Sequence, residues 1–168
     1  MVIYRTAARR AEFTLTEKKS EFIGVCAPVA NEAEALEFIA EIKKKHSAAR
    51  HNVYAYMLRE GFSSRYSDDG EPHGTAGVPV LDAIKKAGIT DTAVVVTRYF
   101  GGILLGTGEL PRAYRRQGGC DSGGNQMRLC CETVRTHKFP ALPPVEFRAA
   151  FMLCFLTGKN AKTYNTQG

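Results

Sequence analysis

The sequence predicts a mixed α+β domain in which a sheet is covered by helices. Residues 13–30, 50–58 and 93–97 are rich in β-branched or alternating apolar residues, a pattern typical of strands. Helical periodicity follows the first of these segments and returns at residues 80–87. Strands and helices therefore alternate along residues 1–110, without an internal repeat or a low-complexity segment.

The first predicted helix has signals at both ends. Asn31 suits the N-cap position, and Glu34 suits its capping-box partner. Residues 43–46, Lys-Lys-Lys-His, place positive charge in the last turn, where it interacts favourably with the helix dipole. The apolar side chains expected to face the sheet are Leu36, Phe38, Ile39 and Ile42.

A long loop is predicted after the strand at residues 50–58. Residues 60–79 contain six glycines and prolines, too many for regular structure, and such loops are often functional. The short helix Val80–Ala87 follows and is expected to stop at Gly88.

The next elements are a strand, a glycine-rich turn and a helix. The apolar run Ala93–Thr97 predicts a central strand. Gly101–Gly108 forms the turn, and a helix begins near Leu110, with Pro111 tolerated in its first turn.

Charge divides the chain into two unlike parts. Residues 1–110 carry 14 Lys+Arg and 14 Asp+Glu, whereas residues 111–168 carry 9 and 3, so the last third holds the whole net charge of +6. Four of the five cysteines also lie there. The neutral first part argues against strong phosphate-driven binding to nucleic acid. No apolar run approaches the ~20 residues of a membrane span and no signal peptide is recognisable, so we expect a cytoplasmic protein without a membrane partner.

The segment Ser67–Gly77 concentrates acidic side chains. Asp68, Asp69 and Glu71, with His73 nearby, have the chemistry for divalent-cation binding or acid–base catalysis. Their oxygens lack the every-second-residue spacing of a calcium loop. The alternative is that the Asp side chains cap their own turn and the downstream helix.

The segment Thr97–Gly108 has glycines between a strand end and a helix start. Backbone N–H groups in such a turn can approach an anion, and Arg98 could add a fork of donors. The segment is neither a P-loop nor a G-x-G-x-x-G motif. The alternative is a tight turn that requires glycine for its backbone conformation. His51 either faces the same cleft or is a structural hydrogen-bonding residue.

Several motifs together resemble the IMPACT/YigZ family over about residues 12–114. They are Lys18–Ile23, Lys45-His46 with Ala49 and His51, Tyr54–Tyr56, Ser67–Gly77 and Val94–Gly108. The resemblance implies a left-handed βαβ fold like that of a small-subunit ribosomal protein and of domain IV of elongation factor G. It also implies a link to translation, because eukaryotic members bind a ribosome-associated regulator and restrain a starvation-sensing kinase. For bacterial members, nucleic-acid binding has been proposed, and no catalysis is established in the family.

The two loops and the resemblance together define one candidate site. Its residues are His51, Ser67, Asp68, Asp69, Gly70, Glu71, Thr75, Arg98, Tyr99, Gly101, Gly102 and Thr107. We assign no catalytic residue and no cofactor, and the candidates for metal ligands are Asp68, Asp69 and Glu71. Short connections keep sequential elements adjacent, so we expect both loops at one end of the sheet, with Asp69 and Gly102 bordering one cleft near His51.

The chain departs from the family pattern at Arg50, at Glu109 where glycine is expected, and at Pro111. After residue 114 the resemblance stops, although bacterial relatives continue the helix and add a ferredoxin-like second domain. Residues 115–125 are rich in glycine and predict a poor helix. We interpret this change as a frameshift, because permitted codons for residues 114–127, read one nucleotide later, can encode an alanine-rich helix.

Two regions follow from this interpretation. Residues 1–114 form a domain of the IMPACT/YigZ N-terminal type with its last helix disrupted, and residues 115–168 form an aberrant or divergent basic tail with little order. The alternative is a genuine tail whose scattered basic residues bind nucleic acid.

Three classes of function stay open. The first is a translation-associated regulatory or binding domain whose partner is the translation machinery or a regulatory protein. The second is an RNA-binding module, which salt-dependent RNA binding would reveal. The third is a metal- or phosphate-dependent enzyme that uses the acidic loop with His51, which metal titration would reveal.

The frameshift interpretation predicts a difference in solution behaviour. A restored helix would bury apolar side chains worth roughly 1.5–3 kcal/mol each, so the frame-restored chain should melt at a higher temperature and aggregate less than the 168-residue chain. Thermal melting and size-exclusion chromatography of both chains measure this. Equal melting temperatures and a monomeric 168-residue chain would instead make the tail a legitimate part of the fold.

Overall fold

A computed structural model describes residues 2–106, 108–118 and 135–139 of the chain. The chain divides into two compact units, one of Ile3–His137 and one of Met1–Val2 with Lys138–Gly168. The sheet and helices discussed below belong to the first unit. No described helix is both long and apolar enough to cross a membrane.

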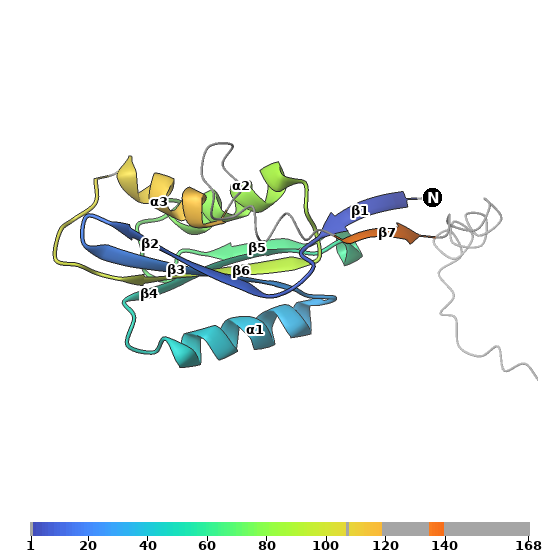
Figure 1. Ribbon diagram of the computed structural model, residues 1–168, viewed down its shortest axis with the longest axis horizontal. Helices are drawn as coiled ribbons and strands as arrows, with labels where there is room; N and C mark the ends of the chain where they lie inside the picture. The colour runs from blue at the N-terminus through green and yellow to red at the C-terminus, as the bar shows by residue number, and fades with distance from the viewer. Residues whose placement is uncertain (1, 107, 119–134, 140–168) are drawn as a thin grey trace, which may run out of the picture. The chain divides into compact units, whose positions relative to one another are not determined.

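A five-stranded antiparallel sheet forms the centre of this unit (Figure 1). Its strands, in spatial order, are β2 (Ala11–Glu17), β3 (Ser20–Pro28), β6 (Thr92–Tyr99), β4 (His51–Met57) and β5 (Ser64–Ser67). β6 is central, as its apolar run predicts, and residues 92–98 are all buried. A separate two-stranded sheet pairs β1 (Val2–Thr6) with β7 (Arg135–Phe139).

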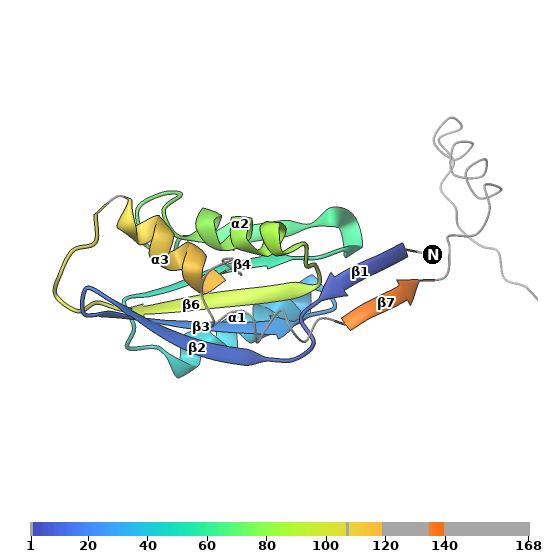
Figure 2. The same cartoon turned by 45° about the horizontal axis from the view of Figure 1, so that its top comes forward.

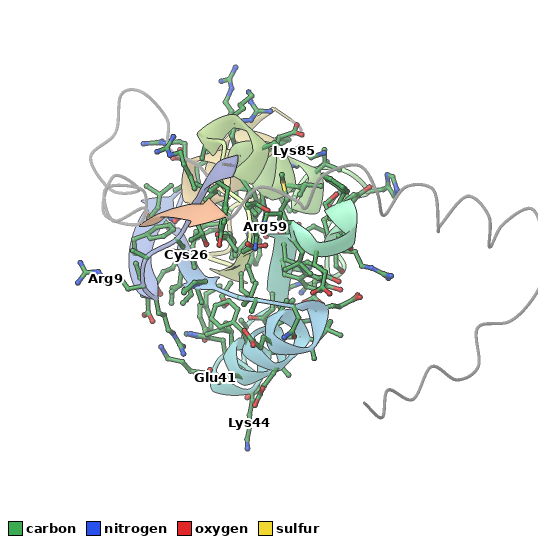
Figure 3. The ribbon with its side chains drawn as sticks, turned by 90° about the vertical axis from the view of Figure 1, so that its right-hand side faces the viewer. Arg9, Cys26, Glu41, Lys44, Arg59 and Lys85 are labelled. Atoms are coloured by element: carbon green, nitrogen blue, oxygen red, sulfur yellow. The ribbon has the colours of Figure 1, made fainter. Side chains whose placement is uncertain are left out.

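Helices cover both faces of the five-stranded sheet (Figure 1). They are α1 (Glu32–Lys45) on one face, and α2 (Gly77–Ala87) and α3 (Glu109–Gly118) on the other. The alternation of side chains along β6 supplies both cores, because Val94 and Val96 pack beneath α2 and α3 whereas Ala93 and Val95 pack beneath α1. In the end-on view of Figure 3, Lys44 of α1 points away from the sheet.

Two crossover connections give the sheet its topology. α1 joins β3 to β4, which are parallel with β6 between them, and α2 joins β5 to β6, which are parallel with β4 between them. The second crossover runs between strands of reversed direction, moves back across the sheet and lies on the opposite face. Rotating the second crossover by a half-turn about the sheet normal gives it the strand direction and the sideways movement of the first crossover, but leaves it on the opposite face. The two crossovers therefore have opposite hands. One of them is therefore left-handed, as the family resemblance implies and against the usual rule.

The segment expected to be extended over residues 13–30 is a hairpin of β2 and β3. Its turn residues, Lys18 and Lys19, both have positive φ, 46° and 64°. Two successive left-handed residues match the right-handed twist of a hairpin, but Asn-Gly usually supplies them. The residues of this turn therefore do not predict its conformation from the sequence.

The capping of α1 agrees with the prediction, whereas its buried face differs by one residue. The Glu34 N–H donates to Asn31 Oδ1 (2.9 Å), and Glu34 Oε2 accepts from the Ala30 N–H (2.8 Å). Leu36 is 49% exposed, so its expected place in the core is wrong. Ala35 takes that place, since positions 35, 38, 39 and 42 share the face turned to the sheet.

The segment 60–79 is more regular than expected. It contains a short 3-10 turn, η1 (Glu60–Phe62), and β5, which pairs with β4 from Tyr54↔Ser67 to Met57↔Ser64. Pairing with a buried neighbouring strand outweighs the low strand propensity of this polar segment. α2 ends at Gly88, which has φ 65° as predicted.

The last described helix continues past residue 114. Gln117 and Gly118 are both buried, and a Cβ on Gly118 would lie 2.7 Å from Val80 Cα, so α3 approaches α2 closely there. Residues 119–134 and 140–168 lie outside the described residues, and with them most of the expected basic tail.

Candidate functional site

The two loops of the candidate site leave the same end of the sheet. β5 and β6 are both antiparallel to β4, so their C-terminal ends point the same way. Residues 68–76 follow β5, and residues 100–108 follow β6; the latter loop projects beyond the β2–β3 turn (Figure 2). β4 begins at this end, where His51 pairs with Arg98.

Asp68 caps the helix that follows its loop. Its Oδ1 accepts the backbone N–H of Ala76 (3.1 Å) and of Gly77 (2.8 Å), and its Oδ2 accepts that of Gly74 (2.9 Å). These donors lie at the positive N-terminal end of α2, where a carboxylate is favoured. Asp68 therefore caps its own turn and the downstream helix, which was the alternative to metal binding or acid–base catalysis.

Asp69 connects the loop to the start of β4. Its carboxylate accepts from Lys43 Nζ (2.6 Å) and from the Asn52 N–H (2.6 Å), and its carbonyl oxygen lies 2.8 Å from His51 Nδ1. Because a carbonyl oxygen only accepts, Nδ1 of His51 carries the proton in this contact. Asp69 has φ 46°, which Asp tolerates better than most residues.

Glu71 lies in a buried polar cluster. One oxygen, Oε1, accepts from Arg98 Nη1 and from the Tyr114 hydroxyl, each at 2.7 Å, and lies 3.8 Å from His51 Nε2. The side chains of Glu71 and Arg98 are only 4% and 7% exposed. Burial, and then the negative charge of Glu71, raise the pKa of Tyr114 well above its usual range. Tyr114 therefore acts as a hydrogen-bond donor to Glu71.

Arg98 touches both loops. Besides its ion pair with Glu71, its guanidinium carbon lies 5.5 Å from the ring centre of Phe22 and 5.6 Å from that of Phe100. Its Nε is buried without a hydrogen-bond partner among the described residues. Arg98 is thus held between core and loop aromatic rings as well as by a carboxylate.

The second loop is fixed at both ends. The Gly101 N–H donates to Ser20 Oγ (3.2 Å), and a Cβ at Gly101 would overlap the backbone of Lys19. Farther along, Glu109 Oε2 accepts from the Gly106 N–H (2.9 Å) and from Lys18 Nζ (2.7 Å). The hydrogen bond from Lys18, followed by that from Gly106, lowers the pKa of Glu109. Position 101 therefore requires glycine, because the backbone of Lys19 packs too closely for a side chain.

The carboxylates of the acidic loop face different partners. Asp68 faces backbone donors, Asp69 faces Lys43, and Glu71 faces Arg98. Among the residues that the structure describes, no three His, Cys, Asp or Glu side chains are grouped to hold a metal ion. The N–H of Gly106 near the start of α3 is likewise taken by Glu109 rather than left open for an anion.

Ser67 and Thr75 make local contacts, whereas Tyr99 contacts the end of α1. Ser67 Oγ accepts from the Asp69 N–H (3.2 Å), Thr75 Oγ1 donates to the Pro72 carbonyl (2.6 Å), and the Tyr99 hydroxyl lies 3.0 Å from His46 Nδ1.

Gly70 and Gly102 both have φ 86°. A Cβ on Gly70 would lie 3.4 Å from His51, whereas one on Gly102 would meet open space. The cleft shared by Asp69 and Gly102 stays a prediction, and Thr107 lies outside the described residues.

Several residues of this end were not singled out from the sequence. Asn52 accepts from Thr97 Oγ1 (2.8 Å) and binds Asp69, while Tyr114 and Lys43 bind the acidic loop from two helices. The available signal was an Asn within a predicted strand, because a polar group that becomes buried there needs a partner.

Comparison with known proteins identifies the fold and its relatives. The Impact N-terminal domain family matches residues 18–119, which is more than half of the chain. The chain belongs to this family.

IMPACT family member YvyE of Bacillus subtilis is 50% identical over 112 residues, which are 66% of this chain and 52% of YvyE. IMPACT family member YigZ of Escherichia coli is 42% identical over 100 residues, 58% of this chain and 49% of YigZ. The chain thus spans about half the length of these relatives. A crystal structure of a hypothetical protein is similar with a TM-score of 0.70 and 33% identity, covering 83% of this chain and 66% of the other.

Membership of the Impact N-terminal domain family confirms the resemblance of residues 18–23, 45–56, 67–77 and 94–108. The match extends to residue 119 and so includes α3, which the structure describes to Gly118.

Removing the Asp68 cap should weaken the fold measurably. Asp68→Ala leaves three N–H groups without their acceptor, and we expect the free energy of unfolding to fall by about 1–2 kcal/mol, as for other helix caps. Urea denaturation measures it. His73→Ala, at an exposed position of the same loop, is the matched control and should change little.

Glu71→Gln should destabilise the domain more strongly, because it leaves the Arg98 charge buried without a counter-charge. We expect a loss of about 3–5 kcal/mol, and a much smaller loss when Glu71→Met and Arg98→Met are combined. Exposed Glu21→Gln serves as the control in the same urea series. A Glu71→Gln midpoint equal to the Glu21→Gln midpoint would show that the buried pair does not hold this end together.

Proposed function

We propose that this chain supplies a binding domain that acts with the translation machinery in the cytoplasm and has no catalytic activity of its own. Membership of the Impact N-terminal domain family supports the link to translation. The chain spans about half of its curated relatives, so the proposal concerns the domain and not the activity of those whole proteins.

The observation that carries the non-catalytic part is the internal pairing of the acidic loop. Glu71 is buried against Arg98 and Tyr114, and Asp68 accepts three backbone N–H groups. A general acid or base must reach its substrate and change protonation state without losing such partners. This pairing instead supports a rigid end of the sheet that serves as a binding surface.

The RNA-binding alternative draws on two exposed basic residues at the same end. Lys44 lies in the last turn of α1, and Arg50 directly precedes β4. The backbone N–H of Arg50 donates a hydrogen bond to the Arg98 carbonyl oxygen (3.2 Å). Two neighbouring cations are paired with carboxylates, Lys43 with Asp69 and Lys45 with Glu12. This pairing lowers the charge available to a phosphate backbone, so a protein surface is the favoured partner.

Co-sedimentation with bacterial ribosomes tests the proposal. We expect the chain to pellet with ribosomes through a sucrose cushion and to remain bound when the salt concentration is raised. Arg50→Glu with Lys44→Glu is the matched variant for the RNA alternative. Binding that falls steeply with salt and is lost in this variant would favour RNA, and no pelleting at any salt concentration would contradict the proposed function.

A further inference from the structure

The loop after β6 exposes three large apolar side chains close together in sequence. We call Phe100, Ile103 and Leu104 the apolar tip; they are 43%, 41% and 83% exposed. Single exposed apolar residues are ordinary on protein surfaces, but a contiguous group commonly marks an interaction site. The next residue, Leu105, packs against the core beneath α2 and α3. The chain thus turns one leucine inward and presents its neighbour to solvent.

The backbone on either side of the tip is held in place. On the β6 side, the Gly101 N–H binds Ser20 Oγ, and the close approach to Lys19 leaves no room for a side chain at 101. On the α3 side, the Gly106 carbonyl accepts the N–H groups of Glu109 (3.0 Å) and Leu110 (3.1 Å).

The side chain of Glu109 adds a clasp between α3 and the β2–β3 turn. It binds the Gly106 N–H and forms an ion pair with Lys18 (2.7 Å). The hydrogen bond from Lys18 lowers the pKa of Glu109 and so favours the charged form of its carboxylate in this contact. A loop fixed in this way loses little conformational entropy on binding, which favours recognition through its tip.

The chemistry of the tip suits a protein pocket better than a nucleic acid. Ile103 and Leu104 are aliphatic and offer no ring for stacking on a base, and the ring of Phe100, the aromatic member of the tip, lies beside the Arg98 guanidinium. Two cations near this loop are neutralised, Lys18 by Glu109 and Arg98 by Glu71, whereas the exposed Lys19 has no carboxylate partner among the described residues. The pairing of Lys18 and Arg98 reduces phosphate-driven attraction at this position, whereas burial of aliphatic side chains is favourable in a protein interface.

We propose that the apolar tip inserts, with Leu104 as its anchor, into an apolar pocket on a protein component of the translation machinery. This inference rests on the proposed function, because it names the contact through which the domain binds. The rigid base of the loop sets the direction of insertion, and the exposed leucine supplies the buried anchor typical of interface hot spots.

Ribosome co-sedimentation of the full chain, with matched variants, tests the inference. Leu104→Asp should weaken binding about tenfold or more, because it places a charge in the pocket, whereas Leu104→Met should bind nearly as well as the wild type. Phe62→Asp changes an exposed apolar residue of η1 (95% exposed) and should bind like the wild type. Thermal melting of each variant verifies that the fold is intact.

The outcomes separate this inference from the proposed function. Equal binding of wild type and Leu104→Asp would overturn the role of the tip while leaving the proposed function standing. Failure of the wild type to pellet would overturn both. Loss of binding in Lys19→Glu, with a steep salt dependence and an unaffected Leu104→Asp, would identify ribosomal RNA as the contact and overturn the protein pocket.

Discussion

The buried ion pair between Glu71 and Arg98 joins three segments that are distant in sequence. Glu71 comes from the loop before α2, Arg98 from the end of β6, and Tyr114 of α3 donates to the same carboxylate oxygen. Tyr114 also packs edge-on against Phe22 of β3, with ring centres 5.3 Å apart. A cation buried at the end of the central strand requires a counter-charge. The path of the acidic loop, which brings Glu71 to this point, follows from that requirement.

Carboxylates also lie at the N-terminal ends of α2 and α3, the two helices that cover one face of the sheet. Asp68 accepts the N–H groups at the start of α2, and Glu109, in the first turn of α3, accepts the N–H of Gly106. An acidic residue near a helix N-terminus satisfies donors that the helix cannot satisfy itself. Asp68, which suggested a metal site in the sequence, therefore has structural partners. Glu109 also ties the second loop to Lys18.

Local patterns in the sequence predicted most of the elements but not their partners. Asn31, the apolar run of β6 and the stop at Gly88 are signals contained within a few residues, and the structure agrees with them. The Lys18-Lys19 turn and β5 were missed because pairing with neighbouring strands determines them. In the site, spacing showed that acidic residues gather in one loop. It did not show that Glu71 meets Arg98, 27 residues away, because only the strand order brings them together.

A buried ion pair adds little stability beyond what apolar side chains of similar volume would give. The ion pair therefore affects the arrangement of the loops at this end of the sheet more than the free energy of unfolding. Arg98 contacts Glu71 in the first loop and Phe100 at the base of the second, so one guanidinium sets the position of both. The hydrogen bond between Arg98 Nη1 and Glu71 Oε1 is directional, so it constrains the orientation of the two side chains as well as filling the space. The pair thus supplies the rigid support that an exposed apolar loop needs if it is to be presented in one conformation.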